Sequence, residues 1–109
     1  MAETFKILAQ SNPAATTSTT LYTVPGGTSA TISSITVCNR SATPTTFRIS
    51  VAIAGAALAD QQYLYFDQAI DGNSTFIATI GITLAATDVI RVFAGAATLT
   101  FNAFGVEVN

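Results

Sequence analysis

The chain has 109 residues, enough for one ordinary domain, and only 9% of them are charged, against roughly 25% in typical soluble domains. Its net charge of −2 argues against nucleic acid and membranes as partners, because nucleic acids and anionic membranes are bound by clustered basic side chains. The absence of histidine excludes Ser-His-Asp and Cys-His catalysis and histidine-ligated zinc.

Residues 1–10 predict a short N-terminal strand centred on Phe5 and Ile7. The opening residues lack the basic and apolar pattern of a signal peptide, and no apolar run approaches the roughly 18 to 20 residues that span a bilayer. Residues 11–18, SNPAATTS, have the small, polar, proline-broken composition of a flexible linker. The strand is therefore expected either to pair with its own sheet or to act as an arm that adds to a neighbour's sheet edge.

Residues 19–109 are expected to form the main β domain, beginning with strands over 19–24 and 29–39. The turn between them, residues 24–27, combines a proline with two glycines, one of which is expected at positive φ. Within 29–39 the apolar positions change parity between Ile32 and Ile35, which predicts a β-bulge. Cys38, the only cysteine, is expected to be a small buried side chain without a disulfide partner in its own chain.

The middle of the chain contains the clearest alternation. Phe47, Ile49, Val51 and Ile53 alternate with polar or small residues and predict a half-buried strand. Residues 55–62, GAALADQQ, predict one or two helical turns, or a long connection that carries the chain from one sheet to the other.

The remaining strands are expected over 63–66, 75–84, 88–93 and 98–108. Gly81 suggests a bulge or bend in the long candidate 75–84, and the apolar parity of 98–108 changes between Phe101 and Phe104, which predicts a second bulge. With about eight antiparallel strands at this spacing, the sequence predicts a single-domain, all-β sandwich of jelly-roll type.

The candidate chemical residues are carboxylates and aromatics. Asp60, Asp67, Asp71 and Asp88, with Asn73 nearby, match no calcium loop and define no glycosidase pair, so they are interpreted as solvated turn residues. Tyr63, Tyr65 and Phe66 could stack against a sugar, but alternating aromatics in a strand more often pack a core and a sheet face. No catalytic, cofactor-binding or metal-binding residue is assigned, and the chain is not expected to be an enzyme.

The scarcity of charge is offset by 18 threonines, together with serine and alanine. A surface poor in charge and rich in apolar groups is typical of interface cores, which predicts a surface covered by other protein. The alternative is a threonine-rich monomer whose hydroxyl groups suffice for solubility.

Three elements carry a resemblance to a known family: the LYTVP strand and turn from residue 21, the VCNR strand end at 37–40, and the LAATDV segment at 84–89. Across residues 21–94 the chain resembles a group of small virion proteins of tailed phages, including phages of cyanobacteria and marine bacteria. The resemblance implies a β-sandwich subunit of a phage particle, assembled in the host cytoplasm and without a catalytic motif.

The expected function is therefore that of a capsid cement or decoration protein that bridges neighbouring capsomers. Its expected partners are the major capsid protein or other virion proteins and further copies of itself. A tail, neck or baseplate component is the alternative within the virion. A receptor- or carbohydrate-binding module, tested through Tyr63 or Tyr65, is the alternative from another class.

Overall fold

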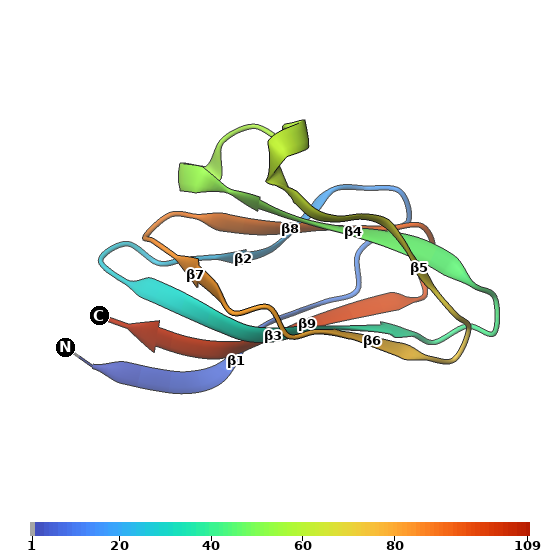
Figure 1. Ribbon diagram of the computed structural model, residues 1–109, viewed down its shortest axis with the longest axis horizontal. Coiled ribbons are helices and arrows are strands. Elements are labelled where there is room, and N and C mark those ends of the chain that lie inside the picture. The colour runs from blue at the N-terminus through green and yellow to red at the C-terminus, as the bar shows by residue number, and fades with distance from the viewer. Residues whose placement is uncertain (1) are drawn as a thin grey trace.

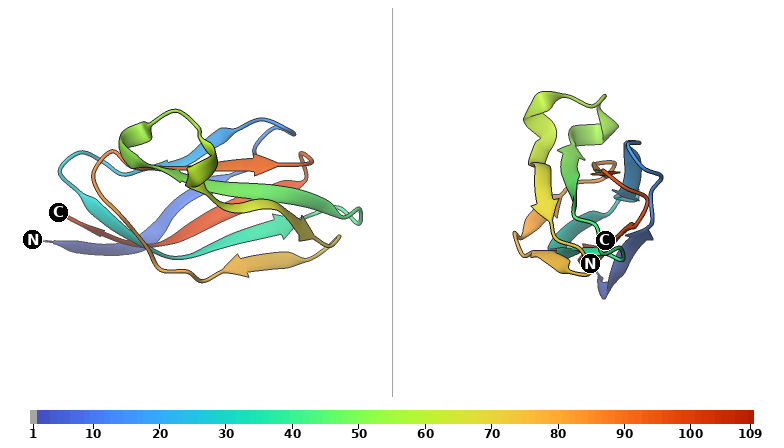
Figure 2. Two further views of the ribbon diagram at one scale, coloured as in Figure 1. Left: turned by 45° about the horizontal axis from the view of Figure 1, so that its top comes forward. Right: turned by 90° about the vertical axis from the view of Figure 1, so that its right-hand side faces the viewer.

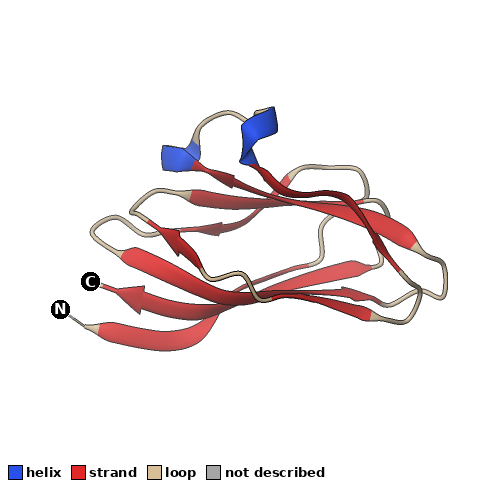
Figure 3. Ribbon diagram, viewed as in Figure 1, coloured by secondary structure: helices blue, strands red, loops and turns tan. Residues whose placement is uncertain are grey.

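The computed structural model describes residues 2–109 and confirms the all-β fold. Its strands are β1 (Glu3–Ser11), β2 (Thr19–Thr23), β3 (Ser29–Asn39), β4 (Thr45–Ala52), β5 (Tyr63–Ile70), β6 (Thr75–Ala78), β7 (Ile82–Leu84), β8 (Val89–Ala94) and β9 (Leu99–Val108). Two single 3₁₀ turns, η1 (Ile53–Gly55) and η2 (Asp60–Gln62), lie in the connection between β4 and β5 (Figure 3).

The strands form two antiparallel sheets that lie one over the other (Figure 1, Figure 2). Sheet A has the order β1-β9-β3-β6, with β7 on the same edge of β3 as β6, and sheet B has the order β2-β8-β4-β5. If β6 and β7 are taken as one interrupted strand, this is the arrangement of a jelly roll. The face of each sheet that points away from the other sheet is its outer face.

The core lies between the two sheets, and both sheets contribute to it. Its largest fully buried side chains are Phe47, Phe101, Ile32, Ile35, Ile49, Ile90 and Leu99. The ring centroid of Phe47 in β4 lies 5.2 Å from that of Phe76 and 6.2 Å from that of Phe101, both in sheet A. These tilted and edge-on contacts are the ones that aromatic pairs prefer, so Phe47 joins the two sheets at the centre of the core.

The predicted bulge in 29–39 is confirmed, and the predicted bulge in 98–108 is wrong. The register of β3 shifts between Ile32 and Ser34, whereas β9 continues without an extra residue. The second irregularity lies in the other neighbour of β9, between Ile7 and Ala9 of β1. Because β9 itself stays regular, its apolar residues after position 103 lie on the opposite face from Leu99 and Phe101.

Three further expectations for individual elements are corrected. β4 ends at Ala52, so Ile53 begins η1 and is 83% exposed instead of half-buried. The strand expected over 75–84 divides into β6 and β7, and the bend suggested by Gly81 is confirmed, since φ is +48° there. For residues 55–62 the expected helical turn is confirmed by η2, whereas the expected crossing to the other sheet is wrong, because β5 pairs directly with β4 and the connection stays within sheet B.

The N-terminal strand pairs within its own chain. β1 runs antiparallel to β9 from the Glu3–Val108 pair to the Ser11–Phe101 pair; Met1 lies outside the described residues. The segment after β1 crosses to sheet B and is held by hydrogen bonds. The Asn12 side-chain amide donates to the carbonyl of Leu99 at 2.9 Å, and the Thr16 amide donates to that of Ala94 at 2.8 Å.

Candidate functional site

The outer face of sheet A carries an apolar strip along β1 and β9. Paired residues of neighbouring strands share a face, and Phe5 pairs with Val106 while Ile7 pairs with Phe104. Phe5 is 77% exposed and Ile7 54% exposed. The strip therefore leaves two large apolar side chains of β1 open to solvent beside the half-buried ones of β9.

The rest of this outer face is uncharged apart from one residue. β3 contributes the hydroxyl side chains Thr31, Ser34 and Thr36, and β6 contributes Ile77, which is 63% exposed. Among the paired residues that the structure places on this face, Glu3 is the one with an ionisable carboxyl or amino group. Apart from Glu3, the paired residues of this face thus carry uncharged side chains, either apolar or with hydroxyl, thiol or amide groups.

The other charged residues of β1 and β9 lie on the inner side of sheet A. The Lys6 amino group is 2.8 Å from the Glu107 carboxylate, which also accepts a hydrogen bond from the Tyr22 hydroxyl of β2. The bond from Lys6, followed by the bond from Tyr22, holds the pKa of Glu107 below its usual value. Burial, and then the contact with Glu107, raises the pKa of Tyr22. This cluster therefore links β1, β9 and β2 beside the core.

The outer face of sheet B has a different character. The Arg48 guanidinium lies 4.1 Å from the ring centroid of Phe66 and 4.4 Å from that of Phe93, and its Nε is 2.7 Å from the Asp67 carboxylate. The hydrogen bond to Asp67 is the main cause of a raised Arg48 pKa. Arg48 is thus positioned by one carboxylate and two aromatic rings.

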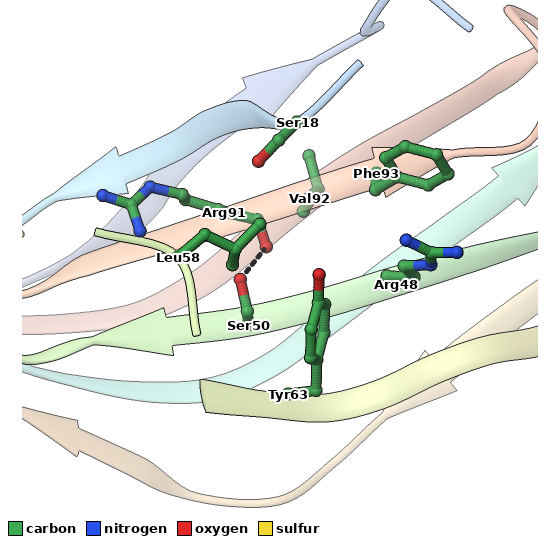
Figure 4. A pocket seen from close by; sticks show the side chains of 8 residues that line it. All are labelled: Ser18, Arg48, Ser50, Leu58, Tyr63, Arg91, Val92 and Phe93. Carbon is green, nitrogen blue, oxygen red and sulfur yellow. Dashed lines mark hydrogen bonds between the residues drawn. The ribbon is translucent and has the colours of Figure 1, made fainter. Parts of the chain in front are cut away.

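A small pocket of about 110 Å³ lies beside Arg48 on the same face (Figure 4). Its lining residues are Ser18, Arg48, Ser50, Leu58, Tyr63, Arg91, Val92 and Phe93. The Arg91 head turns away from the Tyr63 hydroxyl and donates to the carbonyls of Ala56 and Gly55, at 2.9 and 3.3 Å. The volume is well below the roughly 300 to 1,000 Å³ of ordinary ligand clefts. The pocket can hold a small group and cannot enclose a large ligand.

A second hollow, of about 410 Å³, lies where β1 and β9 meet the crossing to sheet B. It is lined by Gln10, Ser11, Asn12, Thr100, Phe101 and Asn102. None of these side chains titrates near neutral pH, so the lining offers the Ser11 and Thr100 hydroxyls no general base that would activate them as nucleophiles.

The structure disperses the candidate carboxylates. Asp67 pairs with Arg48, as described above, and Asp88 accepts hydrogen bonds from the backbone amides of Ala54 and Ala85, both at 2.9 Å. Asp71 contributes its backbone carbonyl to a turn, and Asp60 begins η2. Within residues 2–109 no three potential metal ligands of the His, Cys, Asp or Glu type gather at one place.

The predicted burial of Cys38 is wrong. The residue is only half-buried, and its pairing with Thr75 and Thr100 places it on the outer face of sheet A. After the bulge in β3, Val37 and Asn39 point inward and Cys38 consequently points outward.

The three candidate aromatics of β5 divide between two faces. Tyr65 packs on the core side, with its ring 5.4 Å from that of Phe76. Tyr63 and Phe66 lie on the outer face of sheet B, in edge-to-face contact at 4.9 Å, and Phe66 is 58% exposed. The core interpretation thus holds for Tyr65, whereas the other two rings contact Arg48 and the small pocket.

The described part of the chain, residues 2–109, contains no helix that is long and apolar enough to cross a membrane. Comparison with protein families, curated proteins and solved structures finds no match to this chain.

Proposed function

We propose that this chain is a structural protein of a phage particle, a capsid cement or decoration protein that binds the shell through the outer face of sheet A. The observation that carries this proposal is the exposed, nearly uncharged face on which Phe5, Ile7 and Ile77 lie. Exposed apolar patches of this kind are typical of protein–protein contact sites. The resemblance of residues 21–94 to small virion proteins supplies the expected partner.

The dimensions of the face agree with a protein interface of ordinary size. Four strands at about 4.8 Å and ten residues at about 3.3 Å give a projected area of roughly 600 Å². A standard interface buries roughly 800 Å² of accessible surface per partner, about one seventh of the 5470 Å² of this chain. The area of one side of the sandwich is therefore of the same order as a standard contact.

Many identical copies can act together on a shell. Each bound copy that touches two capsomers links them, and repetition over the lattice multiplies a modest affinity for each site. A small domain without a catalytic centre suits this role, because its mechanism is the burial of surface between subunits.

The test uses purified phage particles that contain this chain. Quantitative mass spectrometry of the particles should find it in hundreds of copies, comparable with the major capsid protein. A number typical of a tail, neck or baseplate ring, a dozen or fewer, would contradict the cement assignment and favour the alternative location within the virion.

A second experiment tests the face itself. Phe5→Ser should reduce binding of the added protein to particles that lack it, whereas Phe66→Ser should bind normally. The two substitutions are chemically identical, and both side chains are exposed, at 77% and 58%, but they lie on opposite outer faces. Equal binding by both variants would refute the assignment to sheet A.

A carbohydrate- or receptor-binding module remains a second candidate, because Tyr63 and Phe66 present ring surface beside Arg48 on sheet B. Rings next to a hydrogen-bonding cation can stack against and orient a sugar. Glycan binding that is abolished by Tyr63→Ala and retained by Phe5→Ser would support this function. No glycan binding by the wild-type chain would exclude it.

A further inference from the structure

The sandwich has four sheet edges, and the edge formed by β1 has the longest regular run of residues. β2 has five residues with one register shift, β5 has two shifts, and β6 and β7 are short and separated by a bend. By contrast, β1 pairs without interruption from Glu3 to Ile7. A long, regular edge strand is a template for pairing with another chain unless it is protected (Figure 1).

The direction of the main-chain groups of β1 follows from its first pair. Ala2 and Asn109 donate backbone hydrogen bonds to each other, at 2.8 and 3.0 Å. Hydrogen-bonded and non-hydrogen-bonded pairs alternate along an antiparallel ladder. The N–H and C=O groups of Thr4 and Lys6 therefore point to β9, and those of Glu3, Phe5 and Ile7 point to the open edge.

Two of the usual protections of an edge strand, a proline and a bulge, are missing between Glu3 and Ile7. This stretch has no proline, and its bulge comes only after Ile7. Lys6 is the one lysine of the chain, and it is held by Glu107 on the inner side of the sheet. The open main-chain groups are flanked on the outer face by the exposed side chains of Phe5 and Ile7.

We propose that two copies of this chain pair through β1, antiparallel and about a two-fold axis at Phe5. In this register Phe5 lies opposite Phe5 of the second copy, and Glu3 lies opposite Ile7. The main-chain N–H and C=O groups of all three residues point to the open edge, so the pairing gives about six main-chain hydrogen bonds. Residues opposite each other share a face, and sheet A therefore continues from one copy into the other.

The neighbouring registers are less favourable. An axis at Lys6 would place the two lysines directly opposite each other, which is a repulsive arrangement. With an axis at Thr4 or at Lys6, only two residue pairs within residues 3–7 would have main-chain groups that face the second copy. Such a register would give about four hydrogen bonds. Charge and hydrogen bonding thus select the same axis.

The proposal of this dimer does not depend on the proposed function. The affinity between the two copies should be weak in free solution. Pairing of so few residues buries less than the roughly 800 Å² per partner of a stable interface. We expect a Kd on the order of 0.1 to 1 mM, with monomer at low concentration. Two joined copies would present one continuous outer face of sheet A.

The register is tested by cysteine trapping in a Cys38→Ser background. Across a hydrogen-bonded pair the Cα atoms are about 5.5 Å apart, within the range that a disulfide can bridge. Phe5→Cys should form a disulfide-linked dimer about tenfold faster than Phe66→Cys on sheet B, and faster than Thr4→Cys or Lys6→Cys. Fastest trapping at Thr4 or Lys6 would overturn the axis at Phe5, and equal rates at Phe5 and Phe66 would overturn the pairing itself.

Sedimentation velocity tests the same contact without a cross-link. The mean mass of the wild-type chain should rise between about 10 µM and about 1 mM. Phe5→Lys should remain monomeric because two lysines would meet at the axis, whereas Phe66→Lys should associate like the wild type. A wild-type chain that stays monomeric throughout would overturn the proposal. The association measured by sedimentation does not depend on the number of copies in the particle. The failure of the dimer proposal can therefore be told from the failure of the cement proposal.

Discussion

Gly105 of β9 determines whether the regular strand can lie between its two bulged neighbours. A Cβ atom at this position would overlap the Thr31 carbonyl oxygen and lie 3.1 Å from the Ile32 Cα atom. Both are backbone atoms of the adjacent strand, so they cannot move aside without separating β3 from β9. Gly105→Ala should therefore destabilise the fold by about 3 kcal/mol or more, as overpacking against rigid backbone does.

Two other glycines provide matched controls for this substitution. At Gly26 an added Cβ would have no atom within 4 Å, and φ is not positive, so Gly26→Ala should change the free energy of unfolding by less than about 0.5 kcal/mol. Gly27 is equally open but has φ of +73°, so Gly27→Ala should cost about 1 to 2 kcal/mol through backbone strain alone.

Urea unfolding of the four proteins measures this series. The loss for Gly105→Ala should appear as a lower midpoint with an unchanged slope. Thermal unfolding should show a decrease of at least about 12 °C, since each kcal/mol is worth about 4 °C or more in a domain of this size. A Gly105→Ala protein within about 1 kcal/mol of the wild type would refute the conclusion that the close approach of β3 requires glycine at this position.

Three further predictions concern the core and the cluster at Glu107. Phe47→Ala should cost about 3 to 5 kcal/mol because its ring is fully buried, whereas Phe66→Ala should cost about 1 kcal/mol or less; equal losses on urea unfolding would contradict the core assignment. Glu107→Gln should cost roughly 1 to 2 kcal/mol at pH 7. The pKa of Glu107 is lowered in the folded state, so its carboxylate contributes to stability above the ordinary pKa of 4.5, and this contribution is lost as pH falls further. The stabilities of the wild type and Glu107→Gln should therefore converge in acid. Parallel plots of stability against pH would contradict this. Because the pKa of Tyr22 is raised in the folded state, the wild type should lose stability as pH rises above 10.0, and Tyr22→Phe should lose less. An equal loss of stability in the two proteins above this pH would contradict the prediction.

The elements with strong local signals could be predicted from the sequence. The alternation around Phe47 and Ile49 identified a strand with one core face, and both side chains are fully buried. The parity change between Ile32 and Ile35 identified a true bulge. In these places the residues that decide the structure are neighbours in the chain.

The same signal failed in 98–108 because a parity change has two possible causes. An extra residue in the strand produces it, and so does a regular strand with apolar residues on both faces. The extra residues lie in β1 and β3, far away in the sequence, so the local pattern of β9 could not distinguish the two. Strand pairing likewise decided that residues 55–62 stay within one sheet.

The sequence indicated a surface poor in charge, but it did not indicate where on the fold that surface lies. Scarce charge predicted a covered surface, yet the outward position of Phe104 and Val106 was hidden by the bulge interpretation. The position of Arg48 between Phe66 and Phe93 had no sequence signal, because the three residues come from three strands that pair only in the folded sheet.

The distribution of the few charges bears on the choice between a covered surface and a threonine-rich monomer. If hydroxyl groups alone made the chain soluble, nothing would require its charges to avoid one side. Instead, Arg48, Asp67 and Arg91 lie on the outer face of sheet B, and Lys6 and Glu107 turn to the inner side of sheet A. Among its paired residues, the outer face of sheet A is left with uncharged side chains, namely apolar, hydroxyl, amide and thiol groups, and a single carboxylate at its end, Glu3. This asymmetry favours a face that is covered, because the core of an interface is depleted of charge whereas a solvated face is not.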